Sequence, residues 1–234
     1  MENARDISSS TLKLVAITCM TFNHAGYIFY PMMPQWAFLA CIVIGGATYP
    51  TMAFLITEGY RRTSNVYRYM MRLFVFALVA QAPFWFFLAQ CGNVLFTLLI
   101  GLVLVHLDHT LDNRVLFALA VVAGCALSYF CDWPIIGPAA VLLFEHLRDR
   151  AHGTVIACWI IAACVAISIP TSLISIALPF YLAGVGGGVF GGIVTSLLLP
   201  RYQGRRGFSI KYFFYIYYPA HIAILGLIHQ LLVG

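Results

Sequence analysis

Hydrophobic residues in this chain gather into long apolar runs that short polar connections separate. Because a bilayer core about 30 Å thick takes roughly 20 apolar residues per helix, most of these runs are predicted to be transmembrane helices. The fourth and sixth runs are short, and each is either a full crossing or a half-helix buried among its neighbours. The nine runs are Leu12–Tyr30, Trp36–Thr57, Met70–Ala89, Val94–His106, Val115–Phe130, Pro134–Phe144, Thr154–Ile169, Ser172–Leu199 and Tyr212–Leu232. We find no internal repeat or linker, so residues 1–234 are predicted to form one domain.

The composition supports an all-α, polytopic membrane bundle of about nine transmembrane segments. Hydrophobic residues make up 62% of the chain and charged residues only 9%, whereas a soluble domain averages about 25% charged residues. This balance excludes a soluble globular protein, a disordered chain, a coiled coil and a nucleic-acid-binding module. Lipid is therefore the expected surrounding, and no nucleic-acid partner is expected.

The basic residues predict the orientation of the bundle. If the N-terminus is cytoplasmic and every run crosses once, all 13 basic residues lie on the cytoplasmic side and the outer connections carry none. Short cytoplasmic loops are enriched in lysine and arginine in this way. We therefore expect a multi-pass protein of the bacterial inner membrane with a periplasmic C-terminus. The basic residues are Arg5, Lys13, Arg61, Arg62, Arg68, Arg72, Arg114, Arg148, Arg150, Arg201, Arg205, Arg206 and Lys211.

Two histidines lie inside predicted spans, where ionisable side chains are costly and are functional candidates. His24 follows Leu12 by twelve residues, which is roughly 18 Å along a helix. His221 lies at a similar depth in the last run, and Pro219 beside it is expected to free a main-chain carbonyl and to kink the helix. From these residues alone, hydrogen-bonded packing and catalysis both remain open.

Three further polar residues are candidates for ligand binding. Glu58 and Arg72 flank a cytoplasmic boundary, where they form either an interfacial ion pair or, if Arg72 faces the bundle, a site for an anionic ligand. Asp132 is the one charged residue on the predicted outer side. It is either incidental or a site for a cationic amine.

The cysteines and glycines carry weaker signals. Cys91 and Cys131 fall in outer connections, where an oxidising compartment would permit a disulfide if their Cα atoms come within about 7 Å. The glycines of the eighth run have the spacing of close helix packing, with a groove for a thin ligand as the alternative. No metal-ligand spacing, P-loop or dinucleotide fingerprint is present. The glycines are Gly184, Gly186, Gly187, Gly188, Gly191 and Gly192.

An ordered set of short motifs resembles the TraX family of conjugative-pilin acetylases, and it covers nearly the whole chain. The motifs run from the first helix to the last, and each is weak alone. They are Lys13-Leu14-Val15-Ala16, Asn23-His24, Tyr49-Pro50, Phe54-Leu55-Ile56, Glu58-Gly59-Tyr60, Tyr69, Arg72-Leu73, Gln81-Ala82-Pro83-Phe84, Asn93-Val94-Leu95-Phe96-Thr97, Gly101, Asp132-Trp133-Pro134-Ile135-Ile136-Gly137 and Phe213-Phe214-Tyr215-Ile216-Tyr217-Tyr218-Pro219-Ala220-His221.

The resemblance implies an activity, a co-substrate and a partner. The family acetylates the N-terminus of a pilin subunit used in conjugation and plasmid transfer, and it is distantly similar to membrane acyltransferases that use cytoplasmic acetyl-CoA. On this basis His24 is expected to be the general base, because an ammonium must lose a proton before it attacks a thioester. His221 is expected to polarise the thioester carbonyl or to orient the acceptor.

The same resemblance assigns binding roles. Arg61, Arg62 and Arg72 are expected to hold the phosphates of CoA, whereas Asp132 and Glu58 are expected to bind the acceptor, with Asp132 attracting the pilin amine. The alternatives are an acyltransferase with another acceptor and a non-enzymatic factor that binds pilin helices in the membrane. A transporter is disfavoured because the chain has no inverted repeat and no acidic relay.

The chain departs from the family pattern at two positions. Asn23 stands where the family has Asp before the histidine, and Gly46 stands where it has Arg on the second helix. If these two residues pair in relatives, losing both avoids one unpaired charge in lipid. His24 is then expected to lack an acidic residue that orients it.

Overall fold

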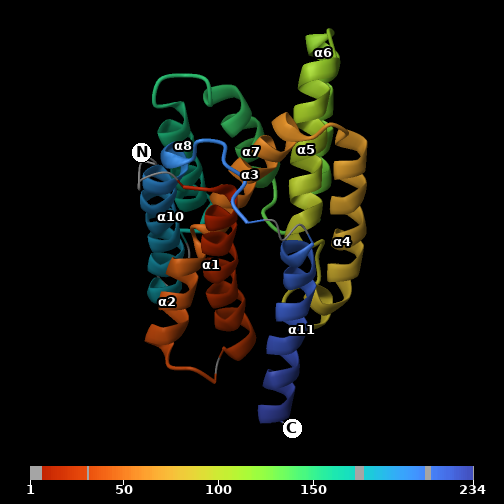
Figure 1. Ribbon diagram of the computed structural model, residues 1–234. Coiled ribbons are helices and arrows are strands. Elements are labelled where there is room, and N and C mark those ends of the chain that lie inside the picture. Colours follow the sequence, from red (N-terminus) through yellow and green to blue (C-terminus); the bar gives the residue numbers. More distant parts are fainter. Residues whose placement is uncertain (1–6, 31, 172–176, 209–211, 234) are drawn as a thin grey trace.

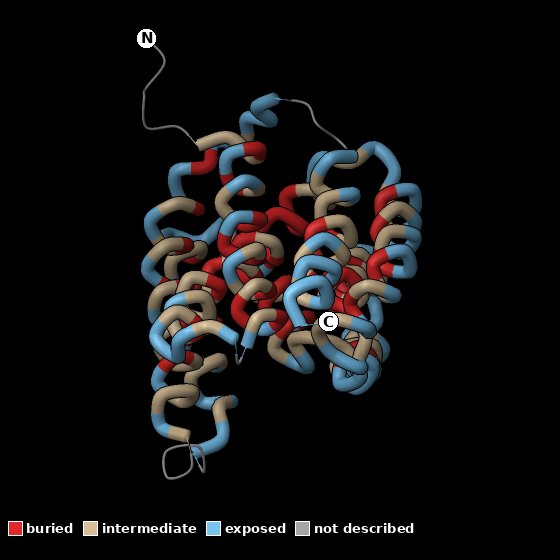
Figure 2. The backbone as a smooth tube through the Cα atoms, turned by 90° about the horizontal axis from the view of Figure 1, so that it is seen from below, coloured by how far each residue is buried: buried red, intermediate tan, exposed pale blue. Residues whose placement is uncertain are grey.

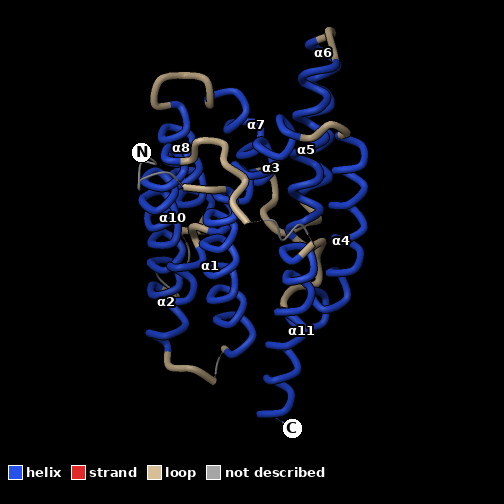
Figure 3. Tube along the Cα trace, in the orientation of Figure 1, coloured by secondary structure: helices blue, strands red, loops and turns tan. Residues whose placement is uncertain are grey.

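The computed structural model describes residues 7–30, 32–171, 177–208 and 212–233. The described part consists of helices joined by short connections, and Figure 3 shows no strand in it. The helices, drawn in Figure 1, are α1 (Ser9–Phe29), α2 (Gln35–Gly45), α3 (Thr48–Arg62), α4 (Val66–Phe87), α5 (Val94–Thr110), α6 (Arg114–Ser128), α7 (Ile136–Leu147), α8 (Gly153–Ser168), α10 (Leu178–Leu198), the 3-10 turn η1 (Leu199–Arg201) and α11 (Phe213–Val233).

Each predicted apolar run contains helix, and the second run contains two helices. The break between α2 and α3 falls at Gly46 and Ala47, where Gly46 packs main chain to main chain against Gly187 of α10. The beginning of the eighth run, together with Arg5 and Lys211, lies outside the described residues. The small residues of α10 therefore serve close helix packing, as their spacing predicts.

The long apolar helices make this chain a membrane protein. Among the described residues, four helical stretches have the length and composition to cross a bilayer, namely Gln35–Arg62, Val66–Phe87, Leu178–Arg201 and Phe213–Val233. The helices α5 to α8 are apolar but shorter. With 12 residues, α7 is only about 18 Å long, so the loop that precedes it must reach into the bundle. Irregular backbone is tolerated at membrane depth where protein surrounds it.

Side-chain caps explain where several helices begin. The side chains of Ser8, Asn65, Asn93 and Asn113 each accept hydrogen bonds from main-chain N–H groups in the first turn of the following helix. These groups have no partner within a helix, and the caps satisfy them. The polar residues between apolar runs thus end one helix and start the next.

The buried core lies where the helices meet in the middle of the bundle. Figure 2 shows the buried stretches inside and the exposed stretches around them. The helix α1 packs against α2, α3 and α11, while α10 packs against α8 and α2, and α5 packs against α7 and α4. Large apolar side chains on the outside, such as Phe86 and Leu231, are strongly exposed. Lipid contact accounts for such an apolar outer surface.

Candidate functional site

The two predicted histidines meet in the core of the bundle. His24 of α1 and His221 of α11 are 197 residues apart, yet the Nδ1 atom of His24 lies 2.7 Å from the Nε2 atom of His221. Their rings are parallel to within 10°, and both residues are buried, with 7% and 6% exposed. This histidine pair is therefore joined by a short hydrogen bond away from bulk water.

The hydrogen bonds define which nitrogen is free to take a proton. The Nδ1 atom of His221 lies 2.8 Å from the main-chain oxygen of Tyr217, and a carbonyl can only accept, so this nitrogen carries a hydrogen. In the neutral pair the Nε2 atom of His221 is then the acceptor for the Nδ1–H of His24. The Nε2 atom of His24 keeps its lone pair, as a general base requires.

Two neighbouring side chains hold His221 in place. The ring of Tyr217 lies parallel to that of His221 to within 12°, at a centroid distance of 4.9 Å. The hydroxyl of Tyr217 is 2.6 Å from the hydroxyl of Thr21 on α1. The helix α11 continues through Pro219, and the carbonyl that His221 uses belongs to Tyr217. Pro219 has no N–H group, so the main-chain carbonyl that loses its helical partner is that of Tyr215, four residues earlier, and not that of Tyr217.

A cavity of about 1030 Å³ opens beside His24. It is lined at one end by basic residues from the start of α1, the end of α3 and the segment after η1, and elsewhere by Asp132 and Trp133. Since His24 follows Lys13 by eleven residues, it lies roughly 16 Å deeper along α1. One continuous space thus connects a basic end, the free side of His24 and an acidic residue.

The basic end of the cavity is formed by Lys13, Arg62, Arg72 and Arg206. Sequence reasoning predicted the two arginines of α3 and α4 but missed the other two residues. Arg72 lies over the ring of Tyr69, at 5.7 Å, and its side chain hydrogen-bonds to Tyr215. Its buried Nε atom has no hydrogen-bond partner in the described part of the chain. A buried donor without a partner is costly, so this nitrogen is available for an anionic ligand.

Glu58 lies at the same end but is engaged by arginines. It is buried, with 3% exposed, and it pairs with Arg148 and, at 3.4 Å, with Arg62. Arg62 also donates to the main-chain oxygen of Gly204 at 2.6 Å. Glu58 therefore neutralises two arginines of the bundle, and it is placed at the opposite end of the cavity from Asp132 rather than beside it.

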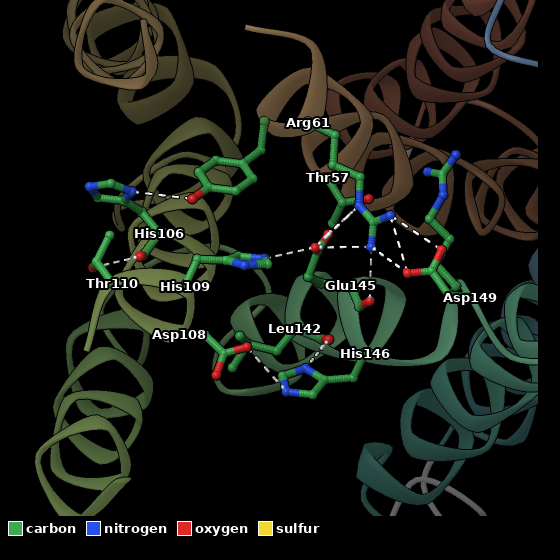
Figure 4. Close-up of polar contacts among 12 residues, drawn as sticks. Thr57, Arg61, His106, Asp108, His109, Thr110, Leu142, Glu145, His146 and Asp149 are labelled. Atoms are coloured by element: carbon green, nitrogen blue, oxygen red, sulfur yellow. Dashed lines mark hydrogen bonds and ion pairs between the residues drawn. The ribbon is translucent and has the colours of Figure 1, made fainter. Parts of the chain in front are cut away.

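Arg61 does not line this cavity. Its guanidinium pairs with Glu145 at 3.0 Å and Asp149 at 3.3 Å, and His109 joins the same carboxylate of Glu145 at 2.9 Å (Figure 4). The hydrogen bonds from Arg61 hold the pKa of the exposed Asp149 carboxyl below its usual value. The position of Arg61 thus does not support its expected role in binding CoA phosphates, because it lies outside the cavity that Arg62 and Arg72 line.

Asp132 lies inside the bundle rather than at its outer surface. The connection between α6 and α7 turns inward (Figure 3), and Trp133 stacks on the fully buried Tyr49 at 4.4 Å. The N–H of Asp132 donates to the Gly92 oxygen at 2.7 Å, and its carbonyl accepts from the hydroxyl of Thr97. These bonds hold the carboxylate at the cavity wall.

The two cysteines of these connections are near each other but are free. Gly92, next to Cys91, donates to the oxygen of Phe130 at 2.8 Å, and this hydrogen bond brings the two loops side by side. Both thiols, Cys91 and Cys131, are unpaired in the structure. The disulfide that the sequence left open is not formed in the structure, and main-chain hydrogen bonds join the loops.

The two departures from the family pattern have a packing explanation. A Cβ atom at Gly46 would overlap the main chain of Gly187, and one at Gly45 would overlap the amide of Asn23. An arginine side chain at position 46 has no room in this arrangement. His221, held by Tyr217, supplies the oriented hydrogen-bond partner that His24 was expected to lack. The only sequence signal for this arrangement is the i, i+4 spacing of Tyr217 and His221.

These features define a class of protein: a helical membrane protein with a buried histidine pair beside an internal cavity that has a basic end and an acidic wall. The TraX protein family matches residues 8–229, and the chain belongs to the TraX family. It is also similar to "Probable fimbrial assembly protein FimC, serogroup H1" of Dichelobacter nodosus, with 29% identity over 94% of this chain and 95% of the relative. No solved structure matches the chain.

Proposed function

We propose that this protein is a membrane-embedded acetyltransferase that uses cytoplasmic acetyl-CoA to modify the N-terminus of a pilin subunit. The proposal rests on a chain of hydrogen bonds in which His24 donates to His221 and His221 donates to the Tyr217 carbonyl. This chain leaves the Nε2 atom of His24 free beside the cavity. Membership of the TraX family and a relative named as a probable fimbrial assembly protein support a pilin as the partner.

The chemistry needs one base and one site for each substrate. A neutral amine attacks the thioester carbonyl, so that a C–N bond forms and, on collapse, the C–S bond breaks. His24 takes the proton from the attacking nitrogen through Nε2 and returns it to the leaving sulfur, which departs as the thiol of CoA. A positioned general base contributes about 10²- to 10⁴-fold to such a reaction.

The substrates are assigned to the ends of the cavity by charge. The basic end of the cavity, which Lys13, Arg62, Arg72 and Arg206 line, suits the phosphates of CoA. One guanidinium group can donate two parallel hydrogen bonds to the oxygens of a phosphate. Asp132 suits the ammonium of the acceptor before it loses its proton. The thioester and the amine then meet beside His24.

The proposed orientation places the basic end of the cavity at the cytoplasm of a bacterium and the C-terminus in the periplasm. The two ends of the described chain lie at opposite ends of the bundle (Figure 1), as an odd number of crossings requires. Reporter fusions test this orientation. A reporter active only outside the cytoplasm is expected to work after Gly234 and to fail after Arg205. A cytoplasmic C-terminus would contradict it.

The decisive experiment for the activity uses purified protein, acetyl-CoA and a peptide that carries the pilin N-terminus. Mass spectrometry is expected to detect one added acetyl group at the α-amine. His24→Ala and His24→Asn are expected to abolish the product while membrane insertion stays normal. His229→Ala is the matched control, because this histidine lies on the same helix and does not line the cavity. An unchanged product in both His24 variants would refute its role.

A second candidate function is a non-enzymatic assembly factor that binds pilin helices in the membrane, which the name of the relative favours. The two functions differ in one measurement. Binding of acetyl-CoA to the purified protein supports the enzyme, whereas binding of pilin without binding of acetyl-CoA supports the assembly factor. Acetylation of a glycan or lipid, with the pilin peptide unmodified, would instead indicate another acceptor.

A further inference from the structure

Two tyrosine hydroxyls are buried at the cavity, and neither finds an acceptor for its hydrogen among the described residues. Tyr49 of α3 is 1% exposed and Tyr218 of α11 is 3% exposed. Both residues line the cavity that contains His24. The main-chain N–H of Val94 donates to the Tyr218 oxygen, but among the described residues neither hydroxyl hydrogen has an acceptor. Buried polar groups are nearly always paired. Two donors without acceptors in the lining of one cavity therefore indicate that a bound molecule supplies the acceptor.

The surroundings of the two rings keep these hydroxyls close to the proposed reaction. The ring of Tyr218 meets the ring of His24 edge to face at 6.0 Å, and it lies three residues before His221 on the same helix. The ring of Tyr49 stacks on Trp133 at 4.4 Å, parallel to within 14°, next to Asp132. Aromatic packing thus holds both side chains and leaves the hydrogen of each hydroxyl free to donate.

Acyl transfer creates a need for such donors. When an amine attacks a thioester, the carbonyl oxygen takes up negative charge, and fixed hydrogen-bond donors stabilise it. In the interior of a helix the main-chain N–H groups are already paired, so side chains are the main source of donors in the middle of a helical bundle. A phenol is a suitable donor because it is neutral and can stay buried when no substrate is bound.

We propose that the hydroxyls of Tyr49 and Tyr218 form the oxyanion site of this protein, donating hydrogen bonds to the carbonyl oxygen of the acyl thioester. The inference rests on the proposed acetyltransferase function and adds two catalytic residues to it. Neither tyrosine loses its proton. The nitrogen of the tetrahedral intermediate carries the positive charge toward Asp132 and His24, while the oxygen carries the negative charge toward the two phenols.

The test removes each hydroxyl alone. Tyr49→Phe and Tyr218→Phe are each expected to lower kcat by about 10²-fold, as the loss of one oxyanion donor does elsewhere, with KM for acetyl-CoA little changed. The melting temperature is expected to stay the same or to rise in Tyr49→Phe, because no protein hydrogen bond is lost. In Tyr218→Phe it is expected to fall slightly, because the Val94 N–H loses its acceptor. Tyr27→Phe is the control, since Tyr27 lines the cavity but is half exposed.

A spectroscopic measurement reports the contact directly. Hydrogen bonds to a thioester carbonyl lower its infrared stretching frequency, so isotope-labelled acetyl-CoA bound to the intact protein is expected to absorb at lower frequency than in either variant. If the intact protein acetylates but both variants keep full kcat and the same carbonyl frequency, the oxyanion assignment is wrong and the tyrosines only pack. If the intact protein does not acetylate at all, the proposed function fails first.

Discussion

Removing His221 tests whether it acts by orienting His24. In His221→Ala the Nδ1–H of His24 loses its acceptor at 2.7 Å and stays buried. A buried donor without a partner costs about 1–3 kcal/mol, and 1.36 kcal/mol is a factor of ten, so the rate is expected to fall about 5- to 150-fold. Removal of the base itself in His24→Ala is expected to cost about 10²- to 10⁴-fold. The acetylation rate should therefore fall less in His221→Ala than in His24→Ala.

A conservative variant separates orientation from packing. In His221→Gln the side-chain oxygen can accept from His24 and the amide group can donate to the Tyr217 carbonyl, so most of the rate is expected to return. The assay is the initial rate of peptide acetylation in detergent at saturating acetyl-CoA, with the melting temperature of each variant measured alongside. The reasoning is refuted if His221→Ala keeps the full rate, if it is as inactive as His24→Ala, or if glutamine restores nothing.

Three further predictions concern binding and stability. Arg72→Ala is expected to weaken acetyl-CoA binding, measured by calorimetry, by about 1.5–3 kcal/mol. Arg61→Ala is expected to leave this binding unchanged, because Arg61 lies outside the cavity. Equal losses of affinity in the two variants would contradict these placements. Gly46→Ala is expected to cost about 1–3 kcal/mol of stability, seen as a lower melting temperature, because its Cβ would overlap main chain of α10; an unchanged temperature would contradict the close packing. Arg61 holds the pKa of the exposed Asp149 below its ordinary value, so their ion pair stabilises the fold at neutral pH and is lost as pH falls below about 4. Because the pair is exposed, it contributes at most about 1 kcal/mol of stability. Asp149→Asn should thus lower the melting temperature slightly at pH 7 and not in acid, and an equal effect in both would refute this sign.

The apolar runs alone determined that this is a helical membrane protein and where its helices lie. Their lengths follow from bilayer thickness, and polar residues such as Asn93 and Asn113 mark helix starts because they cap main-chain N–H groups. The depth of His24 and His221 also follows from counting residues along each run. Hydropathy therefore predicts where along the chain the helices lie.

Only the tertiary structure decided which side chains face one another. A helix that is apolar on all sides carries little information about its facing direction, so the sequence could not show that His221 is the partner of His24. For the same reason Arg61 was grouped with Arg62, although the two adjacent residues point to different neighbours, one to Glu145 and one to Glu58.

The position of Asp132 shows the same limit. From the sequence it lies in a connection between two spans, and such connections are expected at the surface. In the structure α7 is too short to reach that surface, and the loop turns inward onto Tyr49. The length of an apolar run indicates which residues lie in apolar surroundings, but it does not indicate which other helices surround them. The neighbours that make a buried loop acceptable come from helices distant in sequence, and only their packing places the carboxylate beside the cavity.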